Sequence, residues 1–326
     1  MEDPFSDKDF VTAMDADLFG DEESLADAEE KGKKKRKLET VSAIKSDSMK
    51  STVDTTQGKL YAKTTNINDL TFALEHITNI KNCQHVFFCF GPKGLCMMAL
   101  NSAASIASQV FFKTEWFESN YRCPETFVVP IADTQVQMFR DKVKNWEWLE
   151  FTYLTSPTNR LVATGSFRFD VGDNGLTKVP LDELDEPFSN HSFDSIVTTS
   201  HISINASKLM KSVIQTLTKG VSKISMAIEQ QKLSFTAMDG GKELGEASCN
   251  MQQCPSDLQF KVMFNVEMFK SVLKAFRQVK TSSIQLSFDD SFGVMRLTHY
   301  FDEANSQDDQ RSYIRTFLTT VDSSDD

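Results

Sequence analysis

The stretch NASKLMKSVIQTLTKG, residues 205–220, carries three lysines and no acidic residue. The chain of 326 residues nevertheless has a formal net charge of −11. Residues 1–56 contribute −6 (15 acidic and 9 basic residues), and the remainder contributes −5 (31 acidic and 26 basic). Because the overall balance is acidic, only a local concentration of basic side chains could bind a polyanion. The lysines of 205–220 are therefore candidates for such contacts.

The same pattern of basic side chains recurs in other segments that the sequence predicts to be helical. Apolar residues at helical spacing, with capping residues, predict helices over 68–80, 133–146, 205–219 and 265–280. Three of these helices place an apolar stripe on one side and basic residues on an exposed side. The basic residues are Arg140, Lys144, Lys208, Lys211, Lys219, Lys270, Lys274 and Arg277. A solvated helix surface is the alternative, but such surfaces usually mix charges, so the pattern favours a polyanionic partner.

Residue types that commonly carry catalysis or bind metals do not cluster in this sequence. The motifs G-x-x-x-x-G-K-[ST], H-E-x-x-H and G-x-S-x-G are absent, and the five histidines are scattered. Asp289 and Asp290 could bind a metal as a carboxylate pair, but a turn after a strand explains them more simply. The six cysteines form no C-x-x-C pair, and Cys249 with Cys254 would be only half of a metal site. We therefore expect reduced thiols in an intracellular protein, no metal or cofactor, and no enzymatic activity.

Residues 1–56 differ in composition from the rest of the chain. Twelve acidic residues fall in the first thirty positions, followed by the basic run KGKKKRK at 31–37. Such charge blocks bury too little apolar surface to offset the entropy of ordering, so we expect a disordered tail. The run predicts a nuclear-localisation signal made of Lys33, Lys34, Lys35, Arg36 and Lys37, with a general polycationic patch as the alternative. The sequence has no run of 18 apolar residues and no signal peptide, which predicts no membrane span.

From Lys59 onward, short apolar or alternating runs predict strands, and the pattern occurs twice. HVFFCFGPKGLCMMALN (85–101) aligns with KISMAIEQQKLSFTAMD (223–239), and each predicts a β-hairpin. QMFRDKVKNW (137–146) aligns with EMFKSVLKAF (267–276) in the same way. The chain therefore contains one unit twice: a helix, a hairpin, further strands, a second helix and more strands. Chance similarity between β-rich segments is the alternative.

These two copies and their basic helices resemble a sliding clamp of the proliferating cell nuclear antigen (PCNA) type, over residues 59–321. The acidic segment PLDELDEPFSNHSF, with two prolines, is similar to the exposed connector of such clamps. The resemblance implies an α+β, duplicated DNA-clamp fold with two similar helix-and-antiparallel-sheet domains that form a ring. The implied divisions are a tail at 1–56, clamp domain 1 at 57–179, a connector at 180–193, clamp domain 2 at 194–322 and an acidic C-terminal tail at 323–326.

The resemblance also implies a function: a DNA polymerase processivity factor that encircles duplex DNA without sequence specificity. It would tether polymerase and other replication or repair proteins, as a homotrimer whose edge strands lie near 174–181 and 243–251, with or without a clamp loader. The residues implied to face DNA are Arg140, Lys144, Lys208, Lys211, Lys219, Lys270, Lys274, Arg277 and Lys280. The residues implied to form a partner-peptide pocket are Leu100, Ala104, Leu181, Leu184, Pro187, Phe188, Phe317 and Leu318.

Several features depart from the family pattern. The first predicted helix contains no basic residue before Lys81, and Thr319-Thr320 replaces the Ala-Pro that usually follows the last strand. Together with the long acidic tail, this indicates a divergent clamp from a large DNA virus or an early-branching eukaryote, acting in the nucleus or at a viral replication site. The alternatives are a checkpoint-clamp-like subunit or a herpesvirus-like monomeric or dimeric processivity factor, an enzyme acting on nucleic acid, and a scaffold that binds no DNA.

Overall fold

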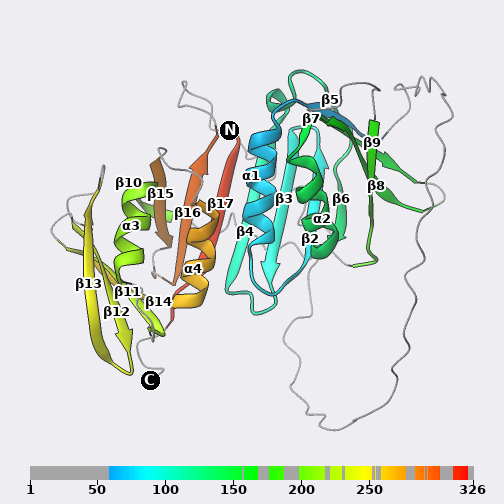
Figure 1. Ribbon diagram of the computed structural model, residues 1–326. Helices are drawn as coiled ribbons and strands as arrows, with labels where there is room; N and C mark the ends of the chain where they lie inside the picture. Colours follow the sequence, from blue (N-terminus) through cyan, green and yellow to red (C-terminus); the bar gives the residue numbers. More distant parts are fainter. Residues whose placement is uncertain are drawn as a thin grey trace, which may run out of the picture. The chain divides into compact units, whose positions relative to one another are not determined.

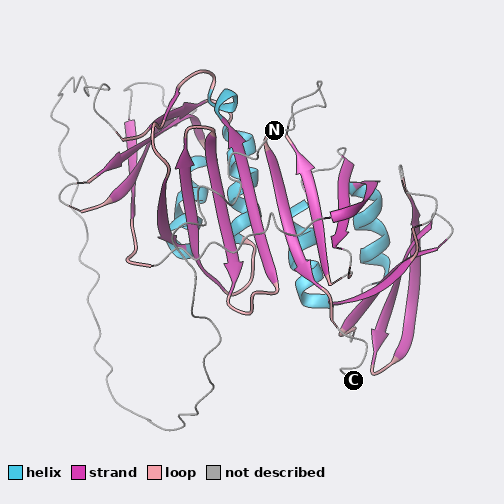
Figure 2. Cartoon of the chain, turned by 180° about the vertical axis from the view of Figure 1, so that it is seen from behind, coloured by secondary structure: helices cyan, strands magenta, loops and turns pink. Residues whose placement is uncertain are grey.

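A computed structural model describes residues 59–155, 158–167, 176–186, 198–216, 221–229, 232–251, 254, 258–276, 283–289, 291, 293–301 and 311–321. All of these residues belong to one compact unit, Gln57–Asp326. Its strands pair antiparallel, and the four described α-helices lie on one side of the sheets (Figure 1). The view from behind shows the opposite faces of the sheets (Figure 2). The predicted α+β class is confirmed.

The largest sheet contains eight strands and joins the two copies of the repeat, in the order β10-β15-β16-β17-β4-β3-β2-β6. Its second-copy strands are β10 (Thr198–Asn205), β15 (Ser283–Asp289), β16 (Val294–Tyr300) and β17 (Tyr313–Thr319). Its first-copy strands are β4 (Ile106–Lys113), β3 (Gly94–Asn101), β2 (Cys83–Gly91) and β6 (Phe127–Ala132). Because β17 pairs with β4, from Tyr313 opposite Phe111 to Leu318 opposite Ile106, one hydrogen-bonded sheet runs through both copies.

Each copy also contributes a smaller sheet of its own. The first copy forms a sheet in the order β5-β1-β7-β8-β9, and the second forms β13-β12-β11-β14. The strands of the first sheet are β1 (Tyr61–Thr64), β5 (Tyr121–Arg122), β7 (Trp146–Leu154), β8 (Arg160–Phe167) and β9 (Leu176–Asp182). The strands of the second are β11 (Lys223–Glu229), β12 (Lys232–Asp239), β13 (Lys242–Asn250) and β14 (Phe260–Asn265).

The strand orders make the duplication explicit. The series β1-β7-β8-β9 of the first copy corresponds to β10-β15-β16-β17 of the second, and β4-β3-β2-β6 corresponds to β13-β12-β11-β14. Both predicted hairpins form, with Gly91 opposite Gly94 in one and Glu229 opposite Lys232 in the other. The internal repeat predicted from the sequence is therefore confirmed in element order and in strand pairing.

All four predicted helices are present, as α1 (Ile67–Thr78), α2 (Asp133–Val143), α3 (Ala206–Thr216) and α4 (Val266–Ala275). Each buries an apolar stripe against the sheets, because this removes its hydrophobic surface from water. α2 ends at Val143 rather than at 146, since Trp146 begins β7 and packs its buried ring against Phe139, with centroids 6.3 Å apart. None of the described helices is long and apolar enough to span a membrane.

The hydrophobic core continues across the joint between the copies. His76 of α1 is fully buried there, and its Nε2 lies 2.5 Å from Oγ1 of Thr316 on β17. Its ring also meets Phe276, just after α4, edge to face at 5.0 Å between centroids. Helices of the first copy thus pack on elements of the second, which holds the helix faces of both copies in one fixed arrangement.

Candidate nucleic-acid interface

The basic face of α3 is solvent-exposed, as predicted. Lys208 and Lys211 are exposed, while Leu209 and Val213 are buried beneath them. The helix begins after Asn205, whose Oδ1 accepts a hydrogen bond from the backbone N–H of Lys208 at 3.1 Å, a typical N-cap contact. Within the described part of the chain, neither lysine makes an ion pair. Both side chains are exposed on the surface of the helix.

Arg140 on α2 is engaged inside the protein. Its side chain is 23% exposed, and Nη1 donates a hydrogen bond to Oγ1 of Thr78 at the end of α1, at 2.7 Å. Its Nη2 lies 3.1 Å from Oδ1 of Asp141, and Nζ of Lys144 lies 4.0 Å from the same oxygen. Arg140 therefore ties two helices together and shares an acidic neighbour with Lys144, and a DNA contact by these two residues stays a prediction.

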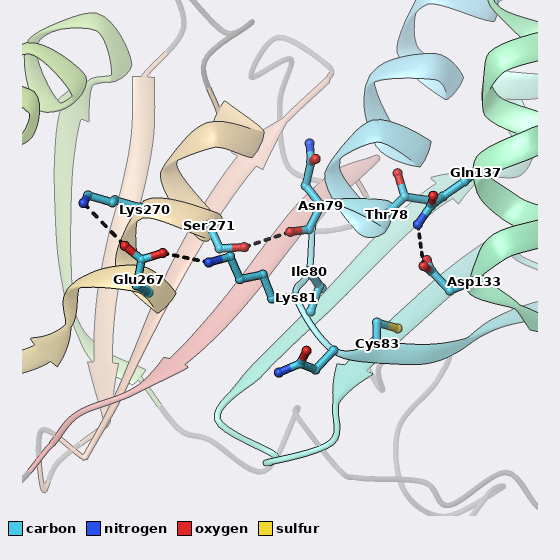
Figure 3. A pocket seen from close by; sticks show the side chains of 11 residues that line it. Thr78, Asn79, Ile80, Lys81, Cys83, Asp133, Gln137, Glu267, Lys270 and Ser271 are labelled. Atoms are coloured by element: carbon cyan, nitrogen blue, oxygen red, sulfur yellow. Dashed lines mark hydrogen bonds and ion pairs between the residues drawn. The ribbon is translucent and has the colours of Figure 1, made fainter.

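Lys270 on α4 also has an acidic neighbour. Its Nζ lies 3.5 Å from Oε1 of Glu267, one helical turn earlier, and its side chain is 37% exposed. The other oxygen of Glu267 lies 2.7 Å from Nζ of Lys81, in the turn after α1 (Figure 3). The hydrogen bond and charge of Lys81, followed by the charge of Lys270, lower the pKa of Glu267. Glu267 is thus a residue of this surface that the sequence pattern did not identify, because Lys81 comes from the other copy.

A cavity of about 370 Å³ lies beside these residues on the helix side of the joint (Figure 3). It is lined by residues from the end of α1 and the starts of α2 and α4, including Asn79, Asp133 and Ser271. Oγ of Ser271 donates a hydrogen bond to the backbone O of Asn79 at 2.8 Å, which fixes α4 against α1. Burial raises the pKa of Asp133.

The other predicted DNA contacts fall outside what the structure describes. Lys219, Arg277 and Lys280 lie outside the described residues, as does the side chain of Lys274. The predicted localisation signal at Lys33, Lys34, Lys35, Arg36 and Lys37 also lies outside them. Among the residues that the structure describes, no group of three or more His, Cys, Asp or Glu side chains is arranged to hold a metal ion.

A second cavity, of about 280 Å³, brings together two predicted pocket residues. Leu100 and Ala104 line it at the ends of β2 and β3, next to His85 and Phe87. Phe87 alternates with the fully buried Val86 and Phe88, so it points away from the helices. Nε2 of His85 lies 3.8 Å from Oε1 of Glu186, which follows β9. This cavity therefore lies beside the start of the predicted connector.

The loop at this cavity is held in a strained conformation. Ala104 has φ of 51°, in the left-handed region that favours glycine. Oδ1 of Asn101 accepts hydrogen bonds from the backbone N–H groups of Ser105 at 2.8 Å and Ile106 at 2.9 Å, which holds the turn in place. The cavity wall is therefore built by backbone geometry that the hydrophobic pattern did not reveal.

The other predicted pocket residues that the structure describes do not line this cavity. Leu181 and Leu318 are 1% and 0% exposed and pack in the hydrophobic core of this chain, so their part in a peptide pocket stays a prediction. Phe317 is 4% exposed on β17. Leu184 is half-buried, and its backbone N–H donates to the O of Pro130 at 2.9 Å. Pro187 and Phe188 lie outside the described residues.

Two of the edge strands, β9 and β13, have no neighbouring strand on one side among the described residues. These strands correspond by duplication to β17 and β4, which pair with each other inside the chain. Leu176 on β9 is 58% exposed and Leu244 on β13 is 49% exposed, and Phe167 at the end of β8 is 37% exposed. An open strand edge can pair with a strand of another chain.

Comparisons with protein-family models and with curated proteins found no match. Solved structures do match. The proliferating cellular nuclear antigen of Entamoeba histolytica aligns with a TM-score of 0.65 and 12% sequence identity, over 81% of this chain and 100% of that one. The PCNA2–PCNA3 complex of Sulfolobus tokodaii gives a TM-score of 0.62 and 10% identity, over 80% of this chain and 98% of that one. At these identities the matches establish the fold.

Proposed function

Because this chain has the fold of the PCNA sliding clamps, we propose that it is a DNA polymerase processivity factor. In this proposal it forms a ring around duplex DNA, binds without sequence specificity, and tethers polymerase and other replication or repair proteins. The observation that supports the DNA contact most directly is the exposed basic face of α3, with Lys208 and Lys211, on the helix side of a duplicated sheet structure. The role is not enzymatic, since retention by a closed ring needs no reacting group.

The proposed ring is a homotrimer joined through β9 of one subunit and β13 of the next. The support comes from the internal joint: β17 pairs with β4 within the chain, and their counterparts β9 and β13 have open edges. A contact between two different surfaces generates a ring when its rotation closes. Each subunit contact would then repeat the geometry of the joint inside the chain.

The proposed binding to DNA is weak and electrostatic. Lysine contacts to phosphate carry no sequence information, and they weaken as salt rises. Because the chain has a net charge of −11, most of its surface repels DNA, and the basic helix face repels it least. A closed ring stays on DNA by topology, so such weak contacts are compatible with both sliding and retention.

We place the docking of polymerase and other partners at the cavity beside Leu100 and Ala104. It lies on the sheet side of the unit and is bordered by the segment that starts the connector, through His85 and Glu186. Import into the nucleus through residues 33–37 is part of the same proposal, with a viral replication site as the alternative location.

A mixed assembly is a second candidate, favoured by one observation: the Sulfolobus tokodaii match is a complex of PCNA2 with PCNA3. This chain would then be one subunit of a mixed ring, as in checkpoint clamps, or a processivity factor that works alone or as a dimer. The mass of the purified chain in solution separates these possibilities. A trimer mass supports the homotrimer, and a smaller mass supports the second candidate.

The DNA contact is tested by the double variant Lys208→Glu and Lys211→Glu. We expect at least about a tenfold loss of affinity for duplex DNA at low salt, because two phosphate contacts are lost. Each lost contact should also reduce the slope of log affinity against log salt by about one. Extension by a polymerase on a primed circle should fall to the level without the protein. Fluorescence anisotropy and primer extension measure these effects.

Lys93→Glu with Lys232→Glu is the matched control, since both lysines are exposed at hairpin turns and the charge change is equal. If both double variants lose DNA binding equally, the effect is one of net charge and the assignment of α3 to the DNA contact is wrong.

A further inference from the structure

One carboxylate on the helix side lies between two lysines that come from different copies of the repeat. Oε2 of Glu267 is 2.7 Å from Nζ of Lys81, and Oε1 is 3.5 Å from Nζ of Lys270 (Figure 3). The two oxygens of Glu267 therefore engage two cations at once. This is how an oxyanion group with several acceptor oxygens, such as a backbone phosphate, binds two lysines.

These ion pairs are exposed to solvent. The side chains of Lys81, Glu267 and Lys270 are 56%, 64% and 37% exposed. Ion pairs between exposed side chains contribute little to stability, and a competing anion of higher charge density can replace the carboxylate. The neighbouring backbone is fixed, because Ser271 donates to the O of Asn79 at 2.8 Å. The lysines are thus anchored on rigid elements while their partner is exchangeable.

The corresponding position of the first copy carries no charge. The alignment of QMFRDKVKNW with EMFKSVLKAF places Gln137 opposite Glu267 and Arg140 opposite Lys270. Gln137 turns to its own helix and donates from Nε2 to Oδ2 of Asp133 at 2.6 Å. An acid in the first turn of α4 does suit the positive end of the helix dipole. The dipole, however, does not account for the contact with Lys81 on the other copy.

We propose that Glu267 is a built-in competitor of DNA: its carboxylate occupies the position of a backbone phosphate between Lys81 and Lys270, and duplex binding replaces it. This inference rests on the proposed function, because it requires the helix side to face DNA. It adds Lys81 to the DNA contacts, although α1 itself supplies no lysine. Glu267 would also regulate DNA binding, because both lysines pair with it again whenever a phosphate leaves.

The test is the variant Glu267→Gln in the full chain, which keeps the shape of the side chain and gives the second copy the residue type of the first. Binding to a short fluorescent duplex is measured by anisotropy between about 50 and 200 mM salt. We expect affinity at the lowest salt to rise by roughly three- to tenfold. The slope of log affinity against log salt should stay nearly unchanged, because Lys81 and Lys270 reach the same phosphates once the duplex has replaced the carboxylate.

Two further variants decide what a change means. Glu125→Gln, in the exposed loop between β5 and β6, makes the same charge change away from the helices and should leave affinity nearly unchanged. Lys81→Ala combined with Glu267→Gln should lose most of the gain. Equal affinities of Glu267→Gln and Glu125→Gln overturn the inference, as does a lower melting temperature of Glu267→Gln without tighter binding.

The outcome is separable from that of the proposed function. Binding by the wild-type protein that disappears in the Lys208→Glu and Lys211→Glu variant, but is unchanged in Glu267→Gln, overturns this inference alone. Absence of DNA binding by the wild-type protein and by Glu267→Gln at every salt concentration overturns both.

Discussion

At the scale of single residues, the joint between the copies contains two buried imidazoles. His76 is fully buried, and burial, with a smaller contribution from the charge of His299, lowers its pKa to about 3. Burial likewise lowers the pKa of His299 to about 4. An unfolded histidine titrates near 6.5, so below that pH the unfolded chain binds more protons than the folded chain. The stability contributed by the neutral imidazoles is complete above about pH 6.5 and is lost as the pH falls towards the folded pKa values.

We therefore expect the free energy of unfolding to fall between about pH 6.5 and 4.5, by on the order of 1 kcal/mol per pH unit for each histidine. His76→Gln removes one titrating group and keeps a side chain that can bond to Thr316, so its pH dependence should be about half as steep. Urea unfolding at a series of pH values measures the difference. Identical profiles for the two proteins would show that His76 does not titrate in this way.

At the scale of elements, close packing between β7 and β8 requires a glycine. A Cβ on Gly165 of β8 would lie 2.2 Å from Cε3 of Trp146 and 2.5 Å from the backbone O of Trp148. Trp146 is 0% exposed and also contacts Phe139 of α2, so it has no room to move. The position of α2 on its sheet thus depends on residue 165 of the neighbouring strand β8 being a glycine.

Gly165→Ala should destabilise the protein by about 1–3 kcal/mol, the usual range for an added group in a packed core. Thermal and urea unfolding measure the loss. Gly245→Ala on β13 is the matched control, because a Cβ added there would meet no atom of the described chain within 4 Å. If the two variants are equally stable, Trp146 is less tightly held than its contacts indicate.

At the scale of the whole molecule, each copy of the repeat pairs one edge strand with the other copy and, among the described residues, leaves one edge of the corresponding strand at its other end unpaired. β17 and β4 close the internal joint, and β9 and β13 carry exposed apolar side chains on their open edges. In a monomer these edges could pair with other chains, a tendency that charged side chains such as Glu243 and Glu246 on β13 reduce. A closed ring covers them all, and it is the assembly that we propose.

Leu244→Asp tests this assembly. It places a third acid beside Glu243 and Glu246 on β13 and removes a side chain that is 49% exposed. We expect the mass measured by sedimentation to fall from that of an oligomer to that of one chain, with the fold retained by circular dichroism. Leu154→Asp, at the end of β7 and 44% exposed, is the control and should keep the oligomer. An oligomer that survives Leu244→Asp argues against the β9–β13 contact.

The sequence by itself determined the duplicated helix-and-hairpin pattern, the four helices and the basic face of α3. These features are periodic and local: a helix with Leu209 and Val213 on one side must place Lys208 and Lys211 on the other, whatever it packs against. They were therefore predictable from spacing alone, as was the loss of charge from α1.

Only the tertiary structure decided which cations remain available. Asp141 and Thr78 hold Arg140, Glu267 joins Lys81 to Lys270, and Leu181 and Leu318 belong to the core. Lys81 and Glu267 meet across 186 residues of sequence, and His76 and Thr316 across 240. Contacts between such distant residues leave no periodic trace in either segment, because they depend on how the two copies pack rather than on how each segment folds.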